Sequence, residues 1–333
     1  MTGATNNVAV GHLALSAITS GDANVSVGYQ AGAGVVTGTY NTFIGAESGL
    51  VASGSAVDNN TGLGFASLKA LTSGSRNTSL GTYSTQQMVN ASDTVAIGYY
   101  TLANALTSTD IDGSVAIGSF SQAENKTGIG NTSVGFQSLK SDVNGDFSTA
   151  IGYQALKTQN GVNGTIGSTA VGYQAGLAIT TGVHNVAIGY LSLDEITTGG
   201  YNVAIGREAL GNCDGAESEN TAIGDRAGLT VDNGSNNILI GANAQPSTSG
   251  AVNQIVLGKD ATGAGVGNNA VTLGNTSITN IYMSQDAGAT VHANYLGLGL
   301  GTTAPESGIE VRLDDSLGQL QLGDNSGNIY HRY

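Results

Sequence analysis

Hydrophobic and small or polar residues alternate over short stretches that recur along most of the chain. The phrase "NVAIG" stands at residues 185–189 and again at 202–206. Such alternation over five positions is typical of a β-strand and not of a helix. We predict a strand in each phrase, with a large-residue face and a small-residue face. The repeat positions of these two copies are Asn185, Val186, Ile188, Gly189, Asn202, Val203, Ile205 and Gly206.

The glycine that ends each phrase recurs sixteen times, most often 17 residues after the previous one. The residue before it is Val, Ile or Leu in every copy, and the residue four before it is Asn in ten copies. A fixed short period is typical of stacked repeats, because so small a unit cannot bury an apolar face alone. We predict an all-β parallel β-roll or β-solenoid of about sixteen short coils over residues 1–280, roughly 75 Å long. Residues 281–333 are predicted to form a junction and a short C-terminal β segment.

Two columns of the repeat are interpreted as structural. Stacked Asn side chains satisfy turn backbone groups and tolerate left-handed conformations, and the glycines mark a corner or a close approach of two chain segments. Every third spacing departs from 17 residues. Duplication of a three-coil unit would explain this rhythm, and so would three phrases arranged as one turn around a wide triangular core. One Val and one Ile per strand would not fill such a core at normal density, which favours duplication.

Composition narrows the function classes. The chain has 333 residues, 52 of them Gly, with 10% charged residues and a net charge of −14. This charge disfavours nucleic acid and anionic membranes as partners. No apolar run of about 18 residues or more is present, so we expect no membrane insertion. Cys213 is the only cysteine, which excludes an intramolecular disulfide, and we interpret it as a loop thiol.

The repeat resembles a known family. "VAIG" phrases and "STAIGYQAL", residues 148–156, look like the head repeats of YadA-like trimeric autotransporter adhesins, in the 17-residue form found in bacteriophage tail fibre proteins. The resemblance covers about residues 7–280. It implies a left-handed parallel β-roll and a side-by-side homotrimer, in which the small-residue face would allow close approach of neighbouring chains. "LGLGTTAPES", residues 298–307, resembles the junction segment of phage tail fibres.

The resemblance implies a structural and binding role without catalysis. The leading expectation is a segment of a virion tail fibre that projects toward or contacts a glycan or protein receptor on the host cell surface. The head of a trimeric adhesin on a bacterial cell surface is the alternative. A self-assembling structural filament is a third reading, of a different class.

Aromatic residues follow the repeat glycine in seven copies. Stacked at coil spacing, these rings would form a shelf for flat sugar faces or another surface contact. Tyrosine also suits any half-exposed corner, because its ring is apolar and its hydroxyl is wet. The surface-contact candidates are Tyr29, Phe65, Tyr99, Phe136, Tyr153, Tyr173 and Tyr190.

Signals for metal and enzyme chemistry are weak. "DVNGD" places Asp142, Asn144 and Asp146 at the alternating spacing that opens a calcium loop. The closing Glu is absent, so a solvated acidic turn competes with a weak structural calcium site. The sequence contains no nucleophile elbow, P-loop or HExxH motif, and its four histidines lie at no metal or catalytic spacing. We predict no catalytic residues and no cofactor.

Overall fold

The computed structural model describes most of the repeat region. Every regular element in the described residues is a β-strand, and none of these residues is helical. The predicted all-β class is therefore confirmed. The described residues are 3–51, 56–104, 111–161, 164–263 and 268–278.

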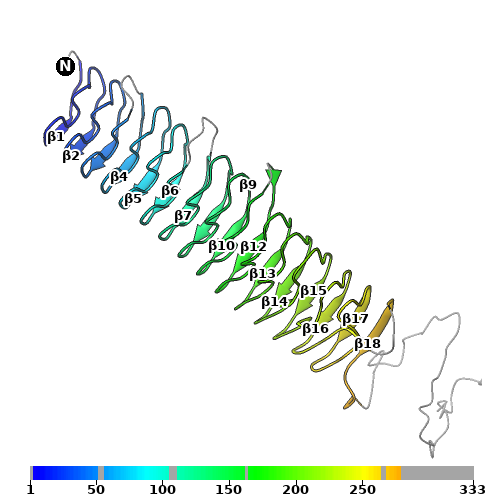
Figure 1. Cartoon of the computed structure of the whole chain (residues 1–333). Helices are drawn as coiled ribbons and strands as arrows, with labels where there is room; N and C mark the ends of the chain where they lie inside the picture. Colours follow the sequence, from blue (N-terminus) through cyan, green and yellow to red (C-terminus); the bar gives the residue numbers. More distant parts are fainter. Residues whose placement is uncertain (1–2, 52–55, 105–110, 162–163, 264–267, 279–333) are drawn as a thin grey trace, which may run out of the picture. The chain divides into compact units, whose positions relative to one another are not determined.

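The chain divides into two units, Met1–Thr279 and Asn280–Tyr333. The first unit contains all of the described strands and forms a stack of coils (Figure 1). The second unit, with the β segment predicted at 281–333, lies outside the described residues.

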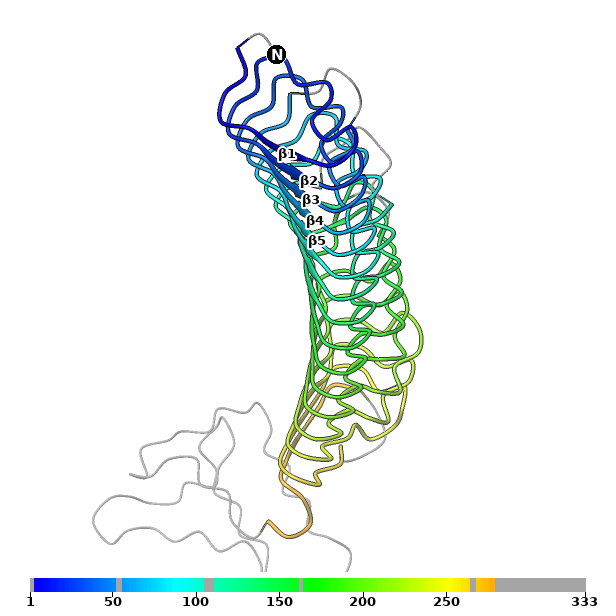
Figure 2. The same ribbon diagram turned by 90° about the vertical axis from the view of Figure 1, so that its left-hand side faces the viewer.

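Sixteen short strands form one parallel sheet along one side of the stack, and two further strands form a small second sheet (Figure 2). The large sheet contains β1 (Val8–Val10), β2 (Val25–Val27), β3 (Thr42–Ile44), β4 (Thr61–Leu63), β5 (Thr78–Leu80), β6 (Val95–Ile97), β7 (Val115–Ile117), β8 (Thr132–Val134), β10 (Thr149–Ile151), β12 (Thr169–Val171), β13 (Val186–Ile188), β14 (Val203–Ile205), β15 (Thr221–Ile223), β16 (Ile238–Ile240), β17 (Gln254–Leu257) and β18 (Ala270–Leu273). The small sheet pairs β9 (Gly145–Asp146) with β11 (Gly164–Thr165).

Each phrase forms one coil. In the large sheet every strand pairs in parallel with the strand of the next phrase, and the register matches repeat positions: Val186 faces Val203, and Ile188 faces Ile205. The parallel β-solenoid of about sixteen coils is thus confirmed. Because consecutive phrases pair directly, three phrases do not form one turn, and the triangular-core explanation of the three-coil rhythm is excluded.

The two faces of the strands are oriented opposite to our expectation. The middle residue of most strands is small and points into the coil: Ala187 and Ala204 are buried, whereas Ile188 is 36% exposed. The small-residue face is therefore unavailable for contact with other chains, and the large residues point outward. A coil of about 17 residues encloses little space, so the residue where the strand faces the opposite wall is usually small, although Phe43 and Leu239 are buried at this position.

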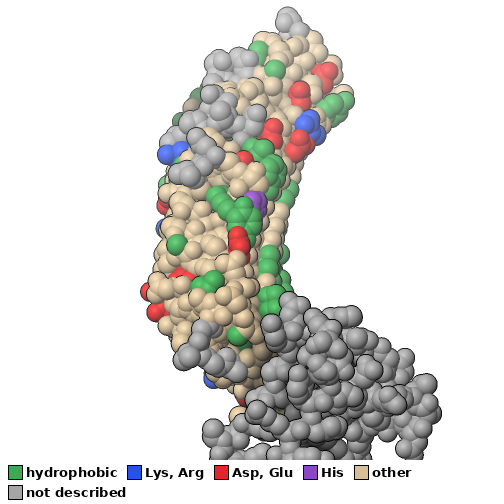
Figure 3. Space-filling model, turned by 90° about the vertical axis from the view of Figure 1, so that its right-hand side faces the viewer, with side chains coloured by type: hydrophobic (Ala, Val, Ile, Leu, Met, Phe, Trp, Pro, Cys, Tyr) green, Lys and Arg blue, Asp and Glu red, His purple; other side chains and the backbone are tan. Residues whose placement is uncertain are grey.

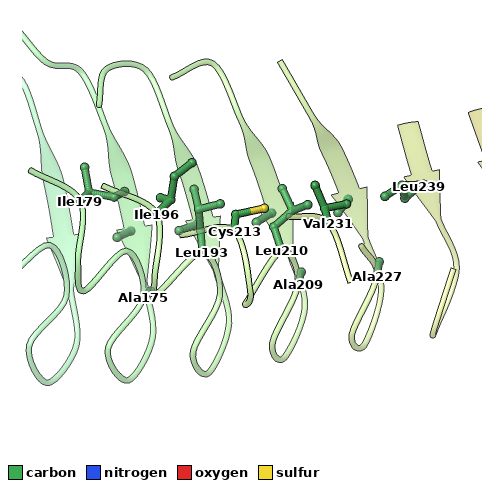
Figure 4. Close-up of a cluster of buried hydrophobic side chains, with 14 of the residues drawn as sticks. Ala175, Ile179, Leu193, Ile196, Ala209, Leu210, Cys213, Ala227, Val231 and Leu239 are labelled. Atoms are coloured by element: carbon green, nitrogen blue, oxygen red, sulfur yellow. The ribbon is translucent and has the colours of Figure 1, made fainter. Parts of the chain in front are cut away.

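The interior is filled from the wall opposite the sheet. Figure 4 shows Leu193 and Ile196 projecting into it, with Leu210, Cys213 and Val231 in neighbouring coils. Ala, Ser or Thr stands three residues after the repeat glycine, and nearly all of these side chains are buried. Cys213 lies outside the strands, as expected of a loop residue, but its thiol is buried.

The Asn column is a buried hydrogen-bonded ladder. The backbone N–H and side-chain amide of Asn202 both donate to Oδ1 of Asn185, at 3.0 and 3.2 Å. The Asn185 amide also donates to the carbonyl of Gly199 at 2.8 Å. Each Asn thus satisfies backbone groups of the next coil that water cannot reach. The predicted ladder that satisfies turn backbone groups is confirmed. The left-handed conformation is not found at these Asn residues; it occurs one residue earlier, at His184 and Tyr201 in these two coils.

The repeat glycines occupy positions that exclude any side chain. Gly189 has φ of +140°, a region that L residues rarely adopt, and a Cβ there would collide with the carbonyl of Gly206. The same contact recurs from coil to coil, so the predicted close approach at these glycines is confirmed.

Candidate functional site

The aromatic candidates lie on one corner of the coils, directly after the repeat glycine. Seven of the exposed large side chains on the described surface stand at this position: Tyr29, Phe65, Tyr99, Phe136, Tyr153, Tyr173 and Tyr190. Six of them belong to a nearly continuous series of ring contacts. Tyr29 lies apart from that series and stacks on His12, with ring centroids 5.7 Å apart. Figure 3 shows hydrophobic side chains gathered in a line along one edge of the stack.

Three further rings complete the series. Tyr83, Tyr100 and Phe120 stand two residues after the repeat glycine, and they link Phe65 to Phe136 through mostly tilted or edge-to-face contacts. Sequence reasoning missed them because it considered only the first position after the glycine. A search for aromatic residues at both positions would have found them.

The second part of the series has a different geometry. The Phe136 and Tyr153 rings lie 5.4 Å apart with 20° between their planes, and those of Tyr153 and Tyr173 lie 5.3 Å apart at 6°. Tyr173 and Tyr190 follow at 5.2 Å and 12°. These four rings are nearly parallel and advance by about one coil each, since neighbouring strands lie about 4.8 Å apart.

A ladder of glutamine amides runs beside these parallel rings. The Gln154 amide donates to Oε1 of Gln137 at 2.8 Å, and the Gln174 amide donates to Oε1 of Gln154 at 2.7 Å. All three residues directly follow a ring and are half-buried. The sequence signal was the triplet "GFQ" at residues 135–137, followed by "GYQ" at 152–154 and 172–174. We define the aromatic–amide strip as Phe136, Gln137, Tyr153, Gln154, Tyr173, Gln174 and Tyr190.

The three calcium candidates do not converge. Asp142 lies inside the coil at 1% exposure, where its carboxylate accepts the Gly145 N–H at 3.0 Å. Oδ1 of Asn144 accepts the Thr127 hydroxyl, and Oδ1 of Asp146 accepts a backbone N–H of the preceding coil. The expectation of a solvated acidic turn is therefore wrong for Asp142. Nothing in this arrangement forms a calcium loop.

Burial controls the ionisation of two groups in the interior. It raises the pKa of Asp142 to about 6, although hydrogen bonds from Gln159, Gly145 and Gly161 lower it. Burial also raises the pKa of the Cys213 thiol, which keeps it in the unreactive protonated form.

One cluster of acidic residues was not predicted from the sequence. Carboxylate oxygens of Asp214, Glu217 and Asp232 lie within 4.8 Å of one another. The Glu217 carboxylate is buried and accepts the N–H groups of Gly215 and Asn233, both at 2.9 Å. These bonds hold a longer loop against the next coil. The contact depends on the irregular spacing, which is why the regular repeat did not indicate it.

Comparison with known proteins identifies no relative of this chain. No family model, curated protein or solved structure matches the chain. Within the described part of the chain, no helix has the length and apolarity needed to cross a bilayer.

Proposed function

We propose that the chain is a rigid, non-enzymatic segment of a trimeric extracellular fibre, of the kind found in phage tail fibres, which projects toward or contacts the surface of a host cell. The observation that carries this proposal is the outward apolar face of the large sheet. The first and last residues of its three-residue strands are mostly Val, Ile, Leu or Thr, and all point away from the core.

We call this face the apolar strip. It is roughly 75 Å long and 10 Å wide, given strands about 4.8 Å apart that rise about 3.3 Å per residue. This area is close to the roughly 800 Å² per partner that a stable protein interface buries. Contiguous exposed apolar surface of this size is typical of interaction sites. Its most exposed members are Val8, Val10, Ile44, Leu63, Ile151, Ile188, Ile223, Ile238, Ile240, Val271 and Leu273.

Self-association explains this strip better than a foreign partner does. Its apolar residues recur at the same repeat positions over sixteen strands, so a second copy presents a surface with the same period. Three copies around one axis would bury the strip and leave the turns on the outside. The solenoid would then supply length and stiffness, and the exposed corners would contact the host surface.

The mass of the chain in solution tests this proposal. We expect light scattering to give three times the 33.2 kDa chain mass. Lysine at two outward strand positions, Ile188→Lys with Ile205→Lys, places charges in the strip and should reduce the mass to one chain. Tyr201→Lys, which changes an exposed residue outside the strip, is the matched control and should leave the trimer intact.

Two results would contradict the trimer. A monomer at micromolar concentration would exclude it, and polymers of indefinite length would favour the self-assembling filament.

A further inference from the structure

We propose that the aromatic–amide strip binds an extended, uncharged glycan chain that lies along the stack with about one sugar per coil. This inference rests on the proposed function, because it names the class of receptor that the fibre contacts. Its four observations are the parallel rings, the amide ladder, the absence of charge and the spacing.

The parallel rings offer apolar contact that is open to solvent. Their centroid distances of 5.2 to 5.4 Å are those of offset stacking, in which each ring covers only part of its neighbour. Tyr153 and Tyr173 accordingly remain 44% and 42% exposed. The uncovered part of each ring can contact the apolar C–H face of a pyranose, and the tyrosine hydroxyls lie beside it.

The amide ladder supplies polar groups at the same spacing. A primary amide has two N–H donors and an oxygen with two lone pairs. The ladder bonds between Gln137, Gln154 and Gln174 use one donor and one lone pair at each step. A donor and an acceptor thus remain at the central Gln154, held in a fixed orientation, and sugar hydroxyls can use both.

The charge of the corner favours an uncharged ligand. None of the seven residues of the strip is charged at neutral pH, although the chain carries a net charge of −14. The same corner becomes charged in the following coils, where Arg207 pairs with Asp225 and Arg226 pairs with Glu208. The neutral strip therefore ends where ion pairs occupy the ring positions.

The spacing favours a glycan over a peptide. A peptide strand that runs along the strip presents side chains to it only at every second residue, about 6.6 Å apart. Such contacts fall out of step with rings 5.2 to 5.4 Å apart after a few coils. An extended chain of pyranoses advances at each residue by about the length of one sugar ring. This advance matches the spacing of the rings along the strip, so successive sugars stay in step with successive coils.

Titration calorimetry of the full chain with linear β-1,4-linked oligosaccharides tests the site. The probes are two uncharged series, of glucose and of N-acetylglucosamine, from the disaccharide to the hexasaccharide. We expect affinity to rise with each added sugar and to level off near the tetrasaccharide, because four parallel rings form the strip. Tyr153→Ala with Tyr173→Ala should weaken tetrasaccharide binding by about tenfold or more, since two of the four stacking contacts are lost and a tenfold change corresponds to about 1.4 kcal/mol.

Two control variants separate the rings from the fold. Tyr153→Phe with Tyr173→Phe keeps the rings and should keep most of the affinity. Tyr201→Ala removes an exposed tyrosine outside the strip and should leave the affinity unchanged.

The outcomes distinguish this inference from the fibre proposal. Failure of both series to bind an intact trimer would overturn the glycan site and leave the fibre proposal standing. Loss of the trimer in the double alanine variant would show instead that the strip is a contact between copies, which also overturns the site. A monomeric chain that binds the glycan in a length-dependent way would contradict the trimer alone.

Discussion

Two segments of the stack form the same coils with different interiors. In the coil that follows Gly189, the fourth and seventh residues after the glycine are Leu193 and Ile196, both buried. In the coil that follows Gly118, the same two positions hold Gln122 and Asn125, which are equally buried. Clustered apolar residues fill the interior from Leu15 to Ala116 and again from Leu139 to Ala261. The polar coil lies between the two clusters.

The polar interior is stable because its groups satisfy one another. The Gln122 amide donates to the carbonyl of Val115 and to Oγ of Ser133, at 3.1 and 2.9 Å. Asn125 donates to Oε1 of Gln122 at 3.1 Å and exchanges two hydrogen bonds with the backbone of Gly128. The interior of a coil therefore needs side chains of the right volume, and it accepts polar side chains only where hydrogen-bond partners are present.

Replacing the apolar interior pair by the polar pair should have the largest effect on stability. Leu193→Gln with Ile196→Asn places the polar pair in the apolar coil, where Ala204 replaces the hydroxyl that Ser133 provides. Each buried aliphatic side chain contributes about 1.5–3 kcal/mol and an unpaired amide costs more. We expect the opening free energy of β13 and β14 to fall by about 4 kcal/mol or more.

Hydrogen exchange resolved by strand measures this loss, because repeat stability is local. Amides of β2 and β3, far along the stack, are the internal control. Unchanged protection in β13 would show that the coil accepts the polar pair without the hydroxyl that Ser133 provides in the polar coil.

The next largest effect should be a dependence of local stability on pH near the polar coil. Asp142 occupies the position of Ile196, and burial raises its pKa to about 6, above the unfolded value of 3.8. The folded state therefore holds the proton more tightly. The contribution of Asp142 to the free energy of unfolding is fully present below about pH 4. As the pH rises toward 6, this contribution, on the order of 3 kcal/mol, is lost.

The Asp142→Asn variant tests this assignment. The variant should abolish the dependence of the opening free energy of β8 and β10 on pH between pH 4 and 6. It should also raise the protection of these strands at neutral pH, because no charge is then buried. Asp260→Asn, at an exposed carboxylate, is the control and should keep the slope. A slope that persists in Asp142→Asn would assign it to another group.

The sequence predicted the period, the strands, the Asn ladder and the glycine contacts, because each is imposed by a neighbour at a fixed spacing. It did not determine which strand face is inside, and the expectation that the small-residue face points outward was wrong. Alternation separates Ala187 from Ile188 but leaves their orientation open, and the answer depends on how much space Leu193 and Ile196 already fill.

The candidate site was predicted in part for a similar reason. The ring that follows the repeat glycine in seven copies was evident, since it occupies a fixed repeat position. The parallel geometry of Tyr153 and Tyr173 and the pairing of Gln154 with Gln174 depend on side-chain packing between coils. A residue pattern read along one coil does not contain that information.

The smallest expected effect comes from restoring the repeat residue in the polar coil. Gln122→Leu places a leucine between Leu102 and Leu139, which are buried at the same position of the neighbouring coils, and so joins the two apolar clusters. Burial of the leucine contributes about 1.5–3 kcal/mol, and the lost amide bonds cost about 1 kcal/mol each. Ser133 keeps its hydroxyl contact with Ser121, and Asn125 keeps Gly128. Three bonds of the Gln122 side chain are lost, so the two terms nearly cancel, and we expect β7 and β8 to lose at most about 1.5 kcal/mol of protection. Gln122→Ala removes the same bonds without filling the space and should lower protection by about 1–3 kcal/mol. If both variants lose protection equally, the hydrogen bonds and not the volume determine what this position accepts.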